Sequence, residues 1–368
     1  MKVMTVFGTR PEAIKMCPLV LELKKNENIE VVVCLTGQHK EMLEQVMDAF
    51  MIKSNYNLNI MKERQSLEAI TEGVMSGISN IIDIENPDCV LVHGDTTTSF
   101  AAGLAAFYKR VPVGHVEAGL RTYDITSPFP EEFNRRAVDL FSELYFAPTE
   151  QARVNLISEG IAEKKIYITG NTVIDALKTT VNANYLDDNL KWAKGTKLIL
   201  MTAHRRENLG KPMQEMFKAV RKVLDERNDL KLIYPVHKNP IVREVAYKYL
   251  GNHERIRLIE PLEVFAFHNY IEKSFFILTD SGGIQEEAPA LGKPVLVMRE
   301  NTERPEGVKA GTLKLIGTSM DSVYNGIKSL IDNDELYQSM SKAVNPYGDG
   351  HASERITEII LNKFMVGK

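Results

Sequence analysis

The sequence predicts an α/β protein of two Rossmann-like, doubly wound domains that face a central cleft. Short runs of β-branched and apolar residues alternate with longer segments of helical period, which is typical of parallel α/β architecture. The chain has 368 residues, more than one ordinary hydrophobic core accommodates, so two domains are expected. Polar residues gather directly after the apolar runs, at the strand ends where open parallel sheets bind ligands.

Two series of strands are expected along the chain. The first series lies near residues 2–7, 29–36, 88–93, 112–116, 143–146 and 165–168, and the second lies near 197–201, 231–235, 256–259, 275–278 and 294–297. Helical segments of sufficient length separate most of these runs, as right-handed crossovers between parallel strands require.

The domain boundary is expected near residue 170, because Gly170-Asn171-Thr172 ends the first series of strands. This prediction gives an N-terminal domain over 1–170 and a C-terminal domain over 171–351. The polar stretch 182–196 either links the domains or forms a surface helix and loop. A last helix begins near residue 352, and we expect residues 352–368 to pack back on the first domain.

The composition argues against several classes of protein. A net charge of −4 gives no general attraction to nucleic acid or to an anionic membrane. The chain contains no run of about 18 apolar residues and its N-terminus enters a strand directly, so we expect a cytoplasmic protein without a membrane span or signal peptide. Cys17, Cys34 and Cys89 lie far apart beside apolar residues, which predicts buried free thiols rather than disulfides or a zinc site.

The run Asp280–Glu287 follows an apolar strand and enters a helix at Ile284. Its adjacent glycines, Gly282 and Gly283, let the backbone approach a ligand closely, and the amides of a helix start favour an anion. Glu287 lies in the first turns, where it is placed to accept hydrogen bonds from a ribose diol. This pattern predicts a site for the diphosphate and ribose of a nucleotide. An ordinary helix cap followed by a glycine turn is the alternative.

A second phosphate-binding turn is expected at Gly8-Thr9-Arg10-Pro11-Glu12, after the first strand. Arg10 and Lys15 supply two cations at a helix start, and a solvated helix face is the alternative for both. A nicotinamide-binding turn needs three spaced glycines, and only Gly8 is present; a P-loop sequence is also absent. The sequence therefore argues against hydride transfer by a bound dinucleotide and against P-loop phosphoryl transfer.

Three carboxylates follow three separate apolar runs. Asp95 comes after the strand near 88–93, Glu117 directly follows the strand near 112–116, and Glu131 or Glu132 begins a helix. Burial beside an apolar strand would suit Glu117 to proton transfer. Asp95 is alternatively a helix cap, and one of the two glutamates only complements the helix dipole. Together these groups predict acid–base chemistry, in which one group removes a proton and another delivers one.

Basic residues follow strands of the second half. His204-Arg205-Arg206 comes after the strand near 197–201 and is typical of a phosphate clamp, because guanidinium groups match phosphate oxygens. His237 ends the next strand, where a core or capping role is an equal alternative. We expect Arg304 to close over the same cleft, and His39 is a further candidate after the second strand.

Several of these segments form an ordered series of motifs along the chain. The series is Gly-Thr-Arg-Pro-Glu at 8–12, His-Gly-Asp at 93–95, His-Val-Glu-Ala-Gly-Leu-Arg-Thr at 115–122, Pro-Glu-Glu at 130–132, Thr-Ala-His-Arg-Arg-Glu-Asn at 202–208, Asp-Ser-Gly-Gly-Ile-Gln-Glu-Glu at 280–287 and Thr-Glu-Arg-Pro-Glu at 302–306. Over nearly the whole chain it resembles the non-hydrolysing UDP-N-acetylglucosamine 2-epimerases of bacteria and archaea.

The resemblance implies a glycosyltransferase-B-like pair of Rossmann-type domains, a homodimer and no nicotinamide cofactor. Members of the family interconvert UDP-N-acetylglucosamine and UDP-N-acetylmannosamine, which are precursors of cell-surface polysaccharides. They eliminate UDP across carbons 1 and 2 of the sugar, leaving 2-acetamidoglucal, and then add UDP back after protonation on the other face. A two-domain cleft that closes would hold both fragments together.

Matched motif by motif, the resemblance implies a role for each candidate residue. The catalytic group is Asp95, Glu117, Glu131 and His204. The substrate-binding group is Arg10, Lys15, Arg135, His237, Phe267, Ser281, Gly282, Gly283, Glu287 and Arg304. Substrate is also an allosteric activator of bacterial members, and the matching positions are Gln38, His39, Glu41, Arg64, Glu131, Arg205 and His237, so that Glu131 would touch both sites.

Other functions fit parts of the same pattern. A hydrolysing 2-epimerase would release free N-acetylmannosamine and UDP, although Gly-Thr-Arg-Pro-Glu at 8–12 favours the non-hydrolysing branch. A paralogue that acts on another UDP-sugar would share the motifs. A glycosyltransferase or a nucleotide-sugar sensor would share the scaffold, but a sensor has no need of Asp95, Glu117 and Glu131 together.

Overall fold

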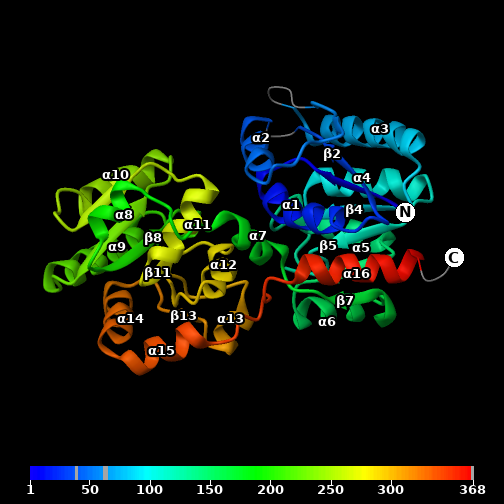
Figure 1. Cartoon of the computed structure of the whole chain (residues 1–368). Coiled ribbons are helices and arrows are strands. Elements are labelled where there is room, and N and C mark those ends of the chain that lie inside the picture. The colour runs from blue at the N-terminus through cyan, green and yellow to red at the C-terminus, as the bar shows by residue number, and fades with distance from the viewer. Residues whose placement is uncertain (38–39, 61–64, 366–368) are drawn as a thin grey trace. The chain divides into compact units, whose positions relative to one another are not determined.

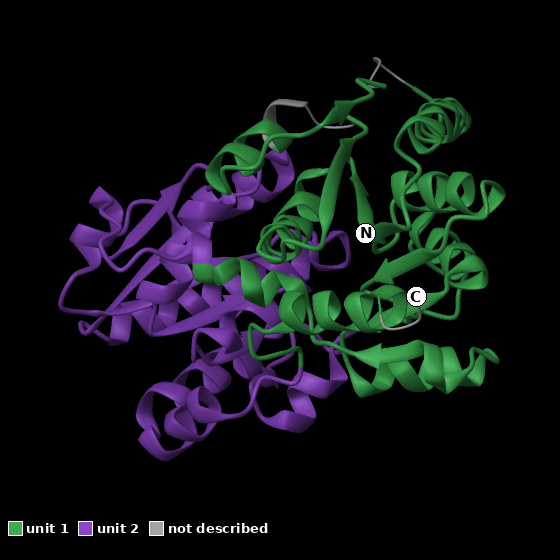
Figure 2. Ribbon diagram, turned by 45° about the vertical axis from the view of Figure 1, so that its right-hand side comes forward, with its two compact units in different colours: residues 1–178, 347–368 green, residues 179–346 purple. Residues whose placement is uncertain are grey.

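The computed structural model describes residues 1–37, 40–60 and 65–365. It divides into two compact units, which Figure 2 distinguishes by colour: unit 1 is Met1–Lys178 with Tyr347–Lys368, and unit 2 is Thr179–Pro346. Unit 1 thus extends past the expected boundaries at residues 170 and 351. It does so because Asp175 accepts hydrogen bonds of 3.2 and 2.8 Å from the backbone amides of Ala352 and Ser353, which ties the two segments together.

Unit 1 contains a seven-stranded parallel sheet with the strand order β3-β2-β1-β4-β5-β6-β7 (Figure 1). Its strands are β1 (Lys2–Phe7), β2 (Glu30–Leu35), β3 (Tyr56–Asn57), β4 (Cys89–His93), β5 (Val113–Val116), β6 (Leu144–Ala147) and β7 (Ile166–Ile168). Apolar residues of β1, β2 and β4 form a core with the helices that cover one face of the sheet. Burying these side chains supplies the main stabilisation of the unit.

The helices of unit 1 are α1 (Arg10–Lys24), α2 (Lys40–Ala49), α3 (Leu67–Glu85), α4 (Thr97–Tyr108), α5 (Glu131–Phe141), α6 (Glu150–Ser158), α7 (Thr172–Thr180) and α16 (Ala352–Met365), with a 3-10 turn η1 (Glu163–Lys165). Helices α1 to α6 lie between successive strands of the parallel sheet, as crossover connections require, whereas α7 leads out of the sheet and α16 follows the last strand of the chain. The last helix, α16, packs against α1.

Unit 2 repeats the design with a six-stranded parallel sheet of order β10-β9-β8-β11-β12-β13. Its strands are β8 (Lys197–Thr202), β9 (Leu230–Pro235), β10 (Ile256–Ile259), β11 (Phe276–Thr279), β12 (Val295–Val297) and β13 (Leu313–Leu315). Its helices are α8 (Asp188–Ala193), η2 (Arg206–Asn208), α9 (Lys211–Glu226), α10 (Pro240–Leu250), α11 (Val264–Lys273), α12 (Ile284–Ala290), α13 (Pro305–Ala310), α14 (Met320–Asp332) and α15 (Asp334–Lys342).

The expected strands are all present, within one or two residues at each end. Two short edge strands, β3 and β13, were not expected, because two or three residues carry too little apolar periodicity to stand out. The polar stretch 182–196 forms α8 and its flanking loops inside unit 2, so the surface-helix alternative is correct. The three cysteines are buried and free, as predicted.

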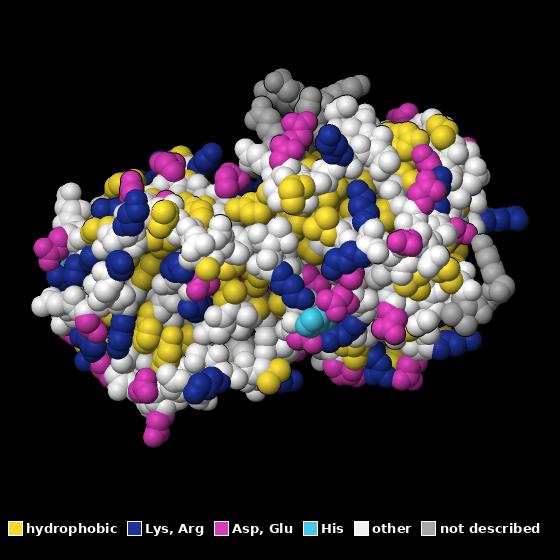
Figure 3. Space-filling model, in the orientation of Figure 1, with side chains coloured by type: hydrophobic (Ala, Val, Ile, Leu, Met, Phe, Trp, Pro, Cys, Tyr) yellow, Lys and Arg dark blue, Asp and Glu magenta, His cyan; other side chains and the backbone are white. Residues whose placement is uncertain are grey.

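The surface and the helices add two observations. On the face drawn in Figure 3, Lys and Arg side chains are interspersed with Asp and Glu, so the net charge of −4 is not gathered there in one acidic area. Every helix within the described ranges is too short or too polar to cross a membrane.

In both sheets the strand order reverses its direction between one pair of adjacent strands. This reversal positions the candidate residues. In unit 1 the order runs outward from β1 and β4 in opposite directions, and in unit 2 it does so from β8 and β11. The connections after such a strand pair leave on opposite faces and open a crevice at the carboxyl ends. The turns after β1 and β4, and those after β8 and β11, are the segments that carry the predicted chemistry.

Candidate active site

In unit 1, Glu117 is the first residue after β5, and its backbone has a left-handed φ of 67°. Its Oε2 atom contacts the ammonium of Lys15 on α1 and accepts a hydrogen bond of 2.8 Å from Asn171 Nδ2. His93 Nε2, at the end of β4, lies 3.7 Å from the same oxygen. A non-glycine residue keeps this backbone conformation only where its surroundings impose it, which is common at functional sites.

Asp95 lies just beyond β4 and forms an ion pair with Arg135 on α5. Asn134 Nδ2 donates a hydrogen bond of 2.9 Å to the Asp95 carbonyl, so α5 holds both the side chain and the backbone of this residue. The next helix, α4, is capped by Thr96, whose hydroxyl accepts from the Ser99 amide at 3.0 Å. The alternative of Asp95 as the helix cap is therefore wrong.

Glu131 and Glu132 begin α5 but have different environments. Glu132 is fully buried and accepts hydrogen bonds from the backbone amides of Thr122 and Tyr123 at 3.1 and 3.2 Å. Its Oε2 also lies 3.2 Å from Arg135 Nη1, so Glu132 fixes the preceding loop and orients the partner of Asp95. Glu131 is half-buried at the first position of the helix, which leaves it accessible.

The turn after β1 is held by Glu12, a residue that the sequence placed in a motif without a role. Its Oε2 accepts hydrogen bonds from the amides of Gly8 and Thr9 at 3.0 and 2.7 Å. Its Oε1 accepts from the hydroxyls of Thr96 and Ser99 at 2.6 and 3.1 Å. Burial raises the pKa of Glu12, and these hydrogen bonds oppose that shift. Glu12 therefore joins the two turns that carry Arg10 and Asp95.

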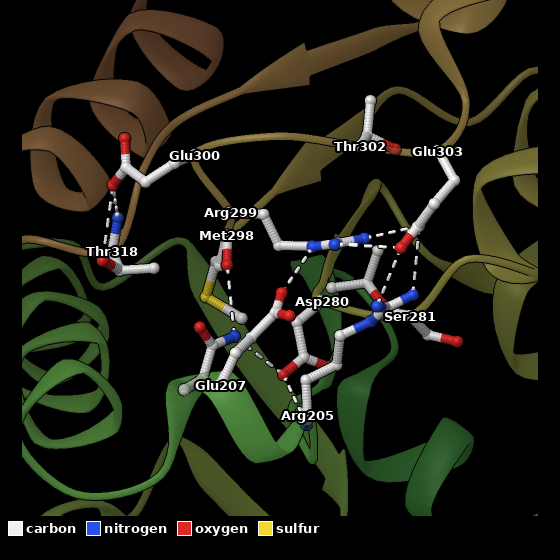
Figure 4. A network of polar contacts seen from close by, with 12 residues as sticks. Arg205, Glu207, Asp280, Ser281, Met298, Arg299, Glu300, Thr302, Glu303 and Thr318 are labelled. Carbon is white, nitrogen blue, oxygen red and sulfur yellow. Dashed lines mark hydrogen bonds and ion pairs between the residues drawn. The ribbon is translucent and has the colours of Figure 1, made fainter. Parts of the chain in front are cut away.

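In unit 2, Asp280 directly follows β11 and is fully buried. Its Oδ2 atom accepts hydrogen bonds from the backbone amides of His204 and Arg205 at 3.0 and 2.9 Å and from Asn208 Nδ2 at 3.1 Å (Figure 4). It does not cap α12, whose N-cap position is Gly283, without a side-chain hydrogen bond. Asp280 therefore anchors the turn after β8, and the helix-cap alternative for it is wrong.

The side chains of His204 and His237 stack at the ends of the neighbouring strands β8 and β9. Their ring centroids are 5.3 Å apart and their planes are 11° from parallel. Burial lowers the pKa of His204, with help from His237 and Arg205, while Asp280 opposes the shift. The His204 side chain is 39% exposed, so a neutral imidazole remains within reach of a ligand.

The turn between β11 and α12 is Ser281-Gly282-Gly283. A Cβ atom on Gly282 or Gly283 would meet its nearest neighbours at 3.6 and 3.9 Å, which is ordinary contact, and neither glycine has a positive φ. The packing of unit 2 therefore accepts a side chain at both positions. What the two glycines leave open is access to the backbone at the start of α12.

Glu287, one turn into α12, is directed back over this turn, because its Oε1 is the atom nearest to a Cβ built on Gly283. Its Oε2 lies 3.5 Å from Nε2 of His268, which is fully buried on α11 and bonds Thr180 Oγ1 through Nδ1 at 2.7 Å. The sequence carried no signal for His268, because its partners are far from it along the chain. The neighbouring Phe267 is half-buried, and its amide donates to the Glu263 carbonyl at 2.8 Å within α11.

The segment after β12 is tied to the same turns by ion pairs (Figure 4). Glu303 contacts Arg299 at 2.7 Å and Arg205 at 3.1 Å. Although burial opposes it, these arginines lower the pKa of Glu303 to about 2. Arg304 contacts Glu286 on α12, and so lies beside the turn that it was expected to close over.

The predicted allosteric positions fall mostly on chain that the structure does not describe. Gln38, His39 and Arg64 lie outside the described residues, and Glu41 is described only as part of α2. The side chain of Arg205, another of these positions, is described by the structure, and its guanidinium is paired with Glu303. Arg10 is the first residue of α1, beside the turn that Glu12 holds.

Comparisons with known proteins agree on one family. A family model described as UDP-N-acetylglucosamine 2-epimerase matches residues 21–361. The UDP-N-acetylglucosamine 2-epimerase of Bacillus subtilis is 58% identical over 361 residues, covering 98% of this chain and 95% of that protein. Among solved structures, S. aureus MnaA with UDP has a TM-score of 0.88 at 56% identity, covering 98% of this chain and 96% of that one. The Neisseria meningitidis UDP-GlcNAc 2-epimerase bound to UDP-GlcNAc has a TM-score of 0.87 at 49% identity, covering 98% and 100%.

Proposed function

Because the chain belongs to the UDP-N-acetylglucosamine 2-epimerase family, we propose that it interconverts UDP-N-acetylglucosamine and UDP-N-acetylmannosamine at carbon 2 of the sugar. The observation that carries this proposal is the pair of carboxylates at the ends of the adjacent strands β4 and β5. A Cβ built on Gly94, the residue before Asp95, would lie 3.5 Å from Glu117 Oε1, so the two acids belong to one small site. Each is paired with a cation, Arg135 or Lys15.

The proposed reaction proceeds through elimination, because the hydrogen on carbon 2 is not adjacent to a carbonyl group. A carboxylate takes this proton, the C–H electron pair forms the double bond of 2-acetamidoglucal, and the C1–O electron pair leaves with UDP. UDP then returns to carbon 1 while an acid delivers a proton to the opposite face of carbon 2. Two acids on separate strands suit the two faces, and we assign these roles to Asp95 and Glu117, with Glu131 as the third acid.

The cations of unit 1 would stabilise the charge that develops on the departing diphosphate. Arg10 and Lys15 lie on the first turns of α1, where the helix dipole also favours an anion. Lys15 contacts Glu117 directly, so the group that stabilises the leaving diphosphate lies beside a group that moves the proton. Arg135 has the same relation to Asp95.

Unit 2 would hold the nucleotide. The open backbone of Ser281-Gly282-Gly283 suits the phosphates, and Glu287, directed back over that turn, suits the ribose hydroxyls. His204 is the candidate that faces the phosphates in a neutral form, since its pKa is lowered mainly by burial. His237 and Arg304 flank the same turns. The Phe267 amide is engaged within α11, so a contact with uracil there would have to use another group of this residue.

One incubation tests the reaction class. The purified protein with UDP-N-acetylglucosamine in deuterated water should yield the manno epimer with deuterium at carbon 2. Free sugar accumulating beside UDP would instead mean a hydrolysing enzyme. Sugar transfer to an acceptor without exchange at carbon 2 would mean a glycosyltransferase, and binding without either would mean a sensor. Exchange with a different UDP-sugar only would mean a paralogue.

Allosteric activation by the substrate belongs to the same proposal. Among the residues that the structure describes, Arg205 supports this part of the proposal. Its backbone amide donates to Asp280, its guanidinium lies beside Gly282, and Glu303 pairs with it. Removing Arg205 should abolish a sigmoidal dependence of rate on UDP-N-acetylglucosamine while leaving the reverse reaction measurable. A hyperbolic curve in the wild-type protein would exclude this regulation.

A homodimer and a biosynthetic role complete the proposal. An open groove of about 810 Å³ between α3 and α4 is lined by apolar residues such as Leu67, Met75 and Tyr108, which a second copy would cover. Light scattering on the wild-type protein and on Tyr108→Glu tests this: the variant should be a monomer.

The three buried free thiols suit a cytoplasmic enzyme that supplies precursors of surface polysaccharides.

A further inference from the structure

A series of alternating charges leads from the surface of unit 1 to the turn that carries Asp95. Glu159 accepts two hydrogen bonds from Arg121, whose side chain is fully buried, and Arg121 Nη2 lies 2.7 Å from Asp139 Oδ2. The other oxygen of Asp139 lies 2.6 Å from His115 Nδ1. His115 Nε2 lies 2.8 Å from the carbonyl oxygen of Gly94. His115 and Asp139 are both buried, so the series ends in a dry environment.

The hydrogen-bond partners of His115 determine its protonation state. A backbone carbonyl only accepts hydrogen bonds, so Nε2 must carry a proton. The Asp139 carboxylate also accepts, so Nδ1 must carry one as well. Although burial opposes it, His115 and Arg121 lower the pKa of Asp139, which keeps that acid ionised. A ring that donates from both nitrogens is an imidazolium.

The neighbouring histidine has the opposite character. Burial lowers the pKa of His93 to about 3, so His93 is neutral beside Glu117. Tyr145 of β6 is the register partner of His115 in the sheet, and its hydroxyl lies 2.7 Å from the backbone carbonyl oxygens of both Asp139 and Ser142. The charge next to the turn is therefore supplied by His115 and balanced by Asp139, whereas the charge of Arg121 is balanced by Asp139 and Glu159.

The imidazolium holds a backbone segment with little freedom of its own. Gly94 has a φ of 64°, its amide donates to the Val116 carbonyl at 2.9 Å, and its carbonyl accepts from His115. The following residue, Asp95, is held through its own carbonyl by Asn134. A Cβ built on Gly94 would lie 3.5 Å from Glu117 Oε1, so this fixed residue lies beside Glu117 and directly precedes Asp95.

We propose that His115 is a charged positioning residue, which with Asp139 fixes the Gly94–Asp95 turn so that the Asp95 and Glu117 carboxylates keep their separation on the substrate. The proposal rests on the proposed epimerisation for its kinetic consequences, but the charged state of the ring does not depend on it. Neither His115 nor Asp139 touches the reacting atoms. Both act through the backbone.

Asp139→Asn is the central variant, because it keeps the shape of the side chain and removes the charge that keeps His115 protonated. In this variant the Gly94–Asp95 turn should be able to shift by about an ångström, because His115 no longer holds it firmly. We therefore expect kcat to fall about tenfold or more while KM for UDP-N-acetylglucosamine stays within about twofold. Tyr145→Phe is the matched control, since it removes a buried hydrogen bond at the same place without changing a charge. It should lower stability and leave kcat unchanged.

A spectroscopic measurement on the intact wild-type protein keeps the test independent of any variant that fails to fold. With the eight histidines labelled with nitrogen-15, both ring nitrogens of His115 should show imidazolium shifts at pH 7.5, and His93 should show a neutral ring. His115 is assigned by the signal lost in His115→Gln. A neutral pattern for His115 at pH 7.5, or wild-type kcat in Asp139→Asn, would overturn the proposal. A wild-type protein that does not epimerise would remove the proposed function and the positioning role, while the spectra would still report the charge on the ring.

Discussion

Glu12 accepts a hydrogen bond of 2.6 Å from the Thr96 hydroxyl, and this contact joins the turn after β1 to the turn after β4. The two turns belong to adjacent strands of the sheet but are separated by most of three helices in the chain. The other carboxylate oxygen of Glu12 accepts hydrogen bonds from the amides of Gly8 and Thr9. One buried carboxylate therefore sets the relative positions of the cations of α1 and of Asp95.

Replacing Glu12 should destabilise unit 1. Glu12→Ala leaves two amides and two hydroxyls without their buried acceptor, so we expect the free energy of unfolding to fall by about 3 kcal/mol or more. Urea unfolding followed by far-ultraviolet circular dichroism measures the change. Glu22→Ala, on the same helix, removes an exposed pair with Lys25 and should cost less than about 1 kcal/mol. Equal losses in the two variants would contradict the anchoring role.

Asp95→Asn should separate chemistry from nucleotide binding. The amide cannot take or deliver the proton, so we expect kcat to fall by about a thousandfold. UDP affinity, measured by calorimetry, should stay within about tenfold, or roughly 1.4 kcal/mol, because the predicted nucleotide site is in unit 2.

The control for Asp95→Asn lies at the opposite end of the same strand. Asp88 precedes β4 and accepts a hydrogen bond of 2.8 Å from the Lys2 amide. Asp88→Asn should retain near-normal activity. Lost folding or lost UDP binding in Asp95→Asn, with Asp88→Asn intact, would mean that Asp95 is structural.

The glycines before α12 should be needed for the ligand and not for the fold. Gly282→Ala and Gly283→Ala place a Cβ in ordinary contact at 3.6 and 3.9 Å, so stability should change by less than about 1 kcal/mol. Trp192, the single tryptophan, belongs to unit 2 and its fluorescence reports the unfolding of that unit. UDP affinity should fall about tenfold or more, because the methyl group occupies the approach to the backbone.

Gly119→Ala gives the opposite pattern and serves as the contrast. This residue of unit 1 has a φ of 86°, and a Cβ there would lie 2.3 Å from the Ala152 carbonyl oxygen. We expect a clear loss of stability, seen by circular dichroism, without a specific loss of UDP affinity. Unchanged UDP binding in both Gly282→Ala and Gly283→Ala would remove this turn from the nucleotide site.

The Glu303 ion pairs should give unit 2 a stability that depends on pH. The pKa of Glu303 in the folded protein, about 2, is below its ordinary value of 4.5. The folded state therefore binds the proton less tightly than the unfolded state, so the stabilisation is complete above pH 4.5 and is lost as the pH falls toward 2. The stability difference between wild type and Glu303→Gln should be largest near pH 6 and should shrink below pH 4.5.

Trp192 fluorescence in urea at several pH values measures this difference. Glu300→Gln is the control, because Glu300 lies in the same segment and accepts from the Thr318 amide at 3.2 Å instead of pairing with these arginines (Figure 4). A difference for Glu303→Gln that is constant from pH 6 to pH 4 would show that the ion pairs contribute nothing.

The sequence alone determined the architecture and the list of candidate residues. Alternating apolar strands and helical segments specify parallel α/β units, since burial of β-branched runs depends on local pattern. The motif series identified the family, and the positions of Asp95 and Glu117 directly after strands followed from the same pattern. The prediction missed β3 and β13, because very short edge strands bury too few residues to leave a periodic signal.

Only the tertiary structure decided which candidates meet and which merely hold others in place. The adjacent residues Glu131 and Glu132 are equivalent in the sequence, but the rotation of α5 turns Glu132 inward as an anchor. Asp280 proved to be an anchor for the turn at His204. The charged form of His115 is stabilised by Asp139, which lies on a different element. Hydrogen bonds between residues far apart in the chain have no local pattern, because they arise only when strand order brings separate turns to the same edge of a sheet.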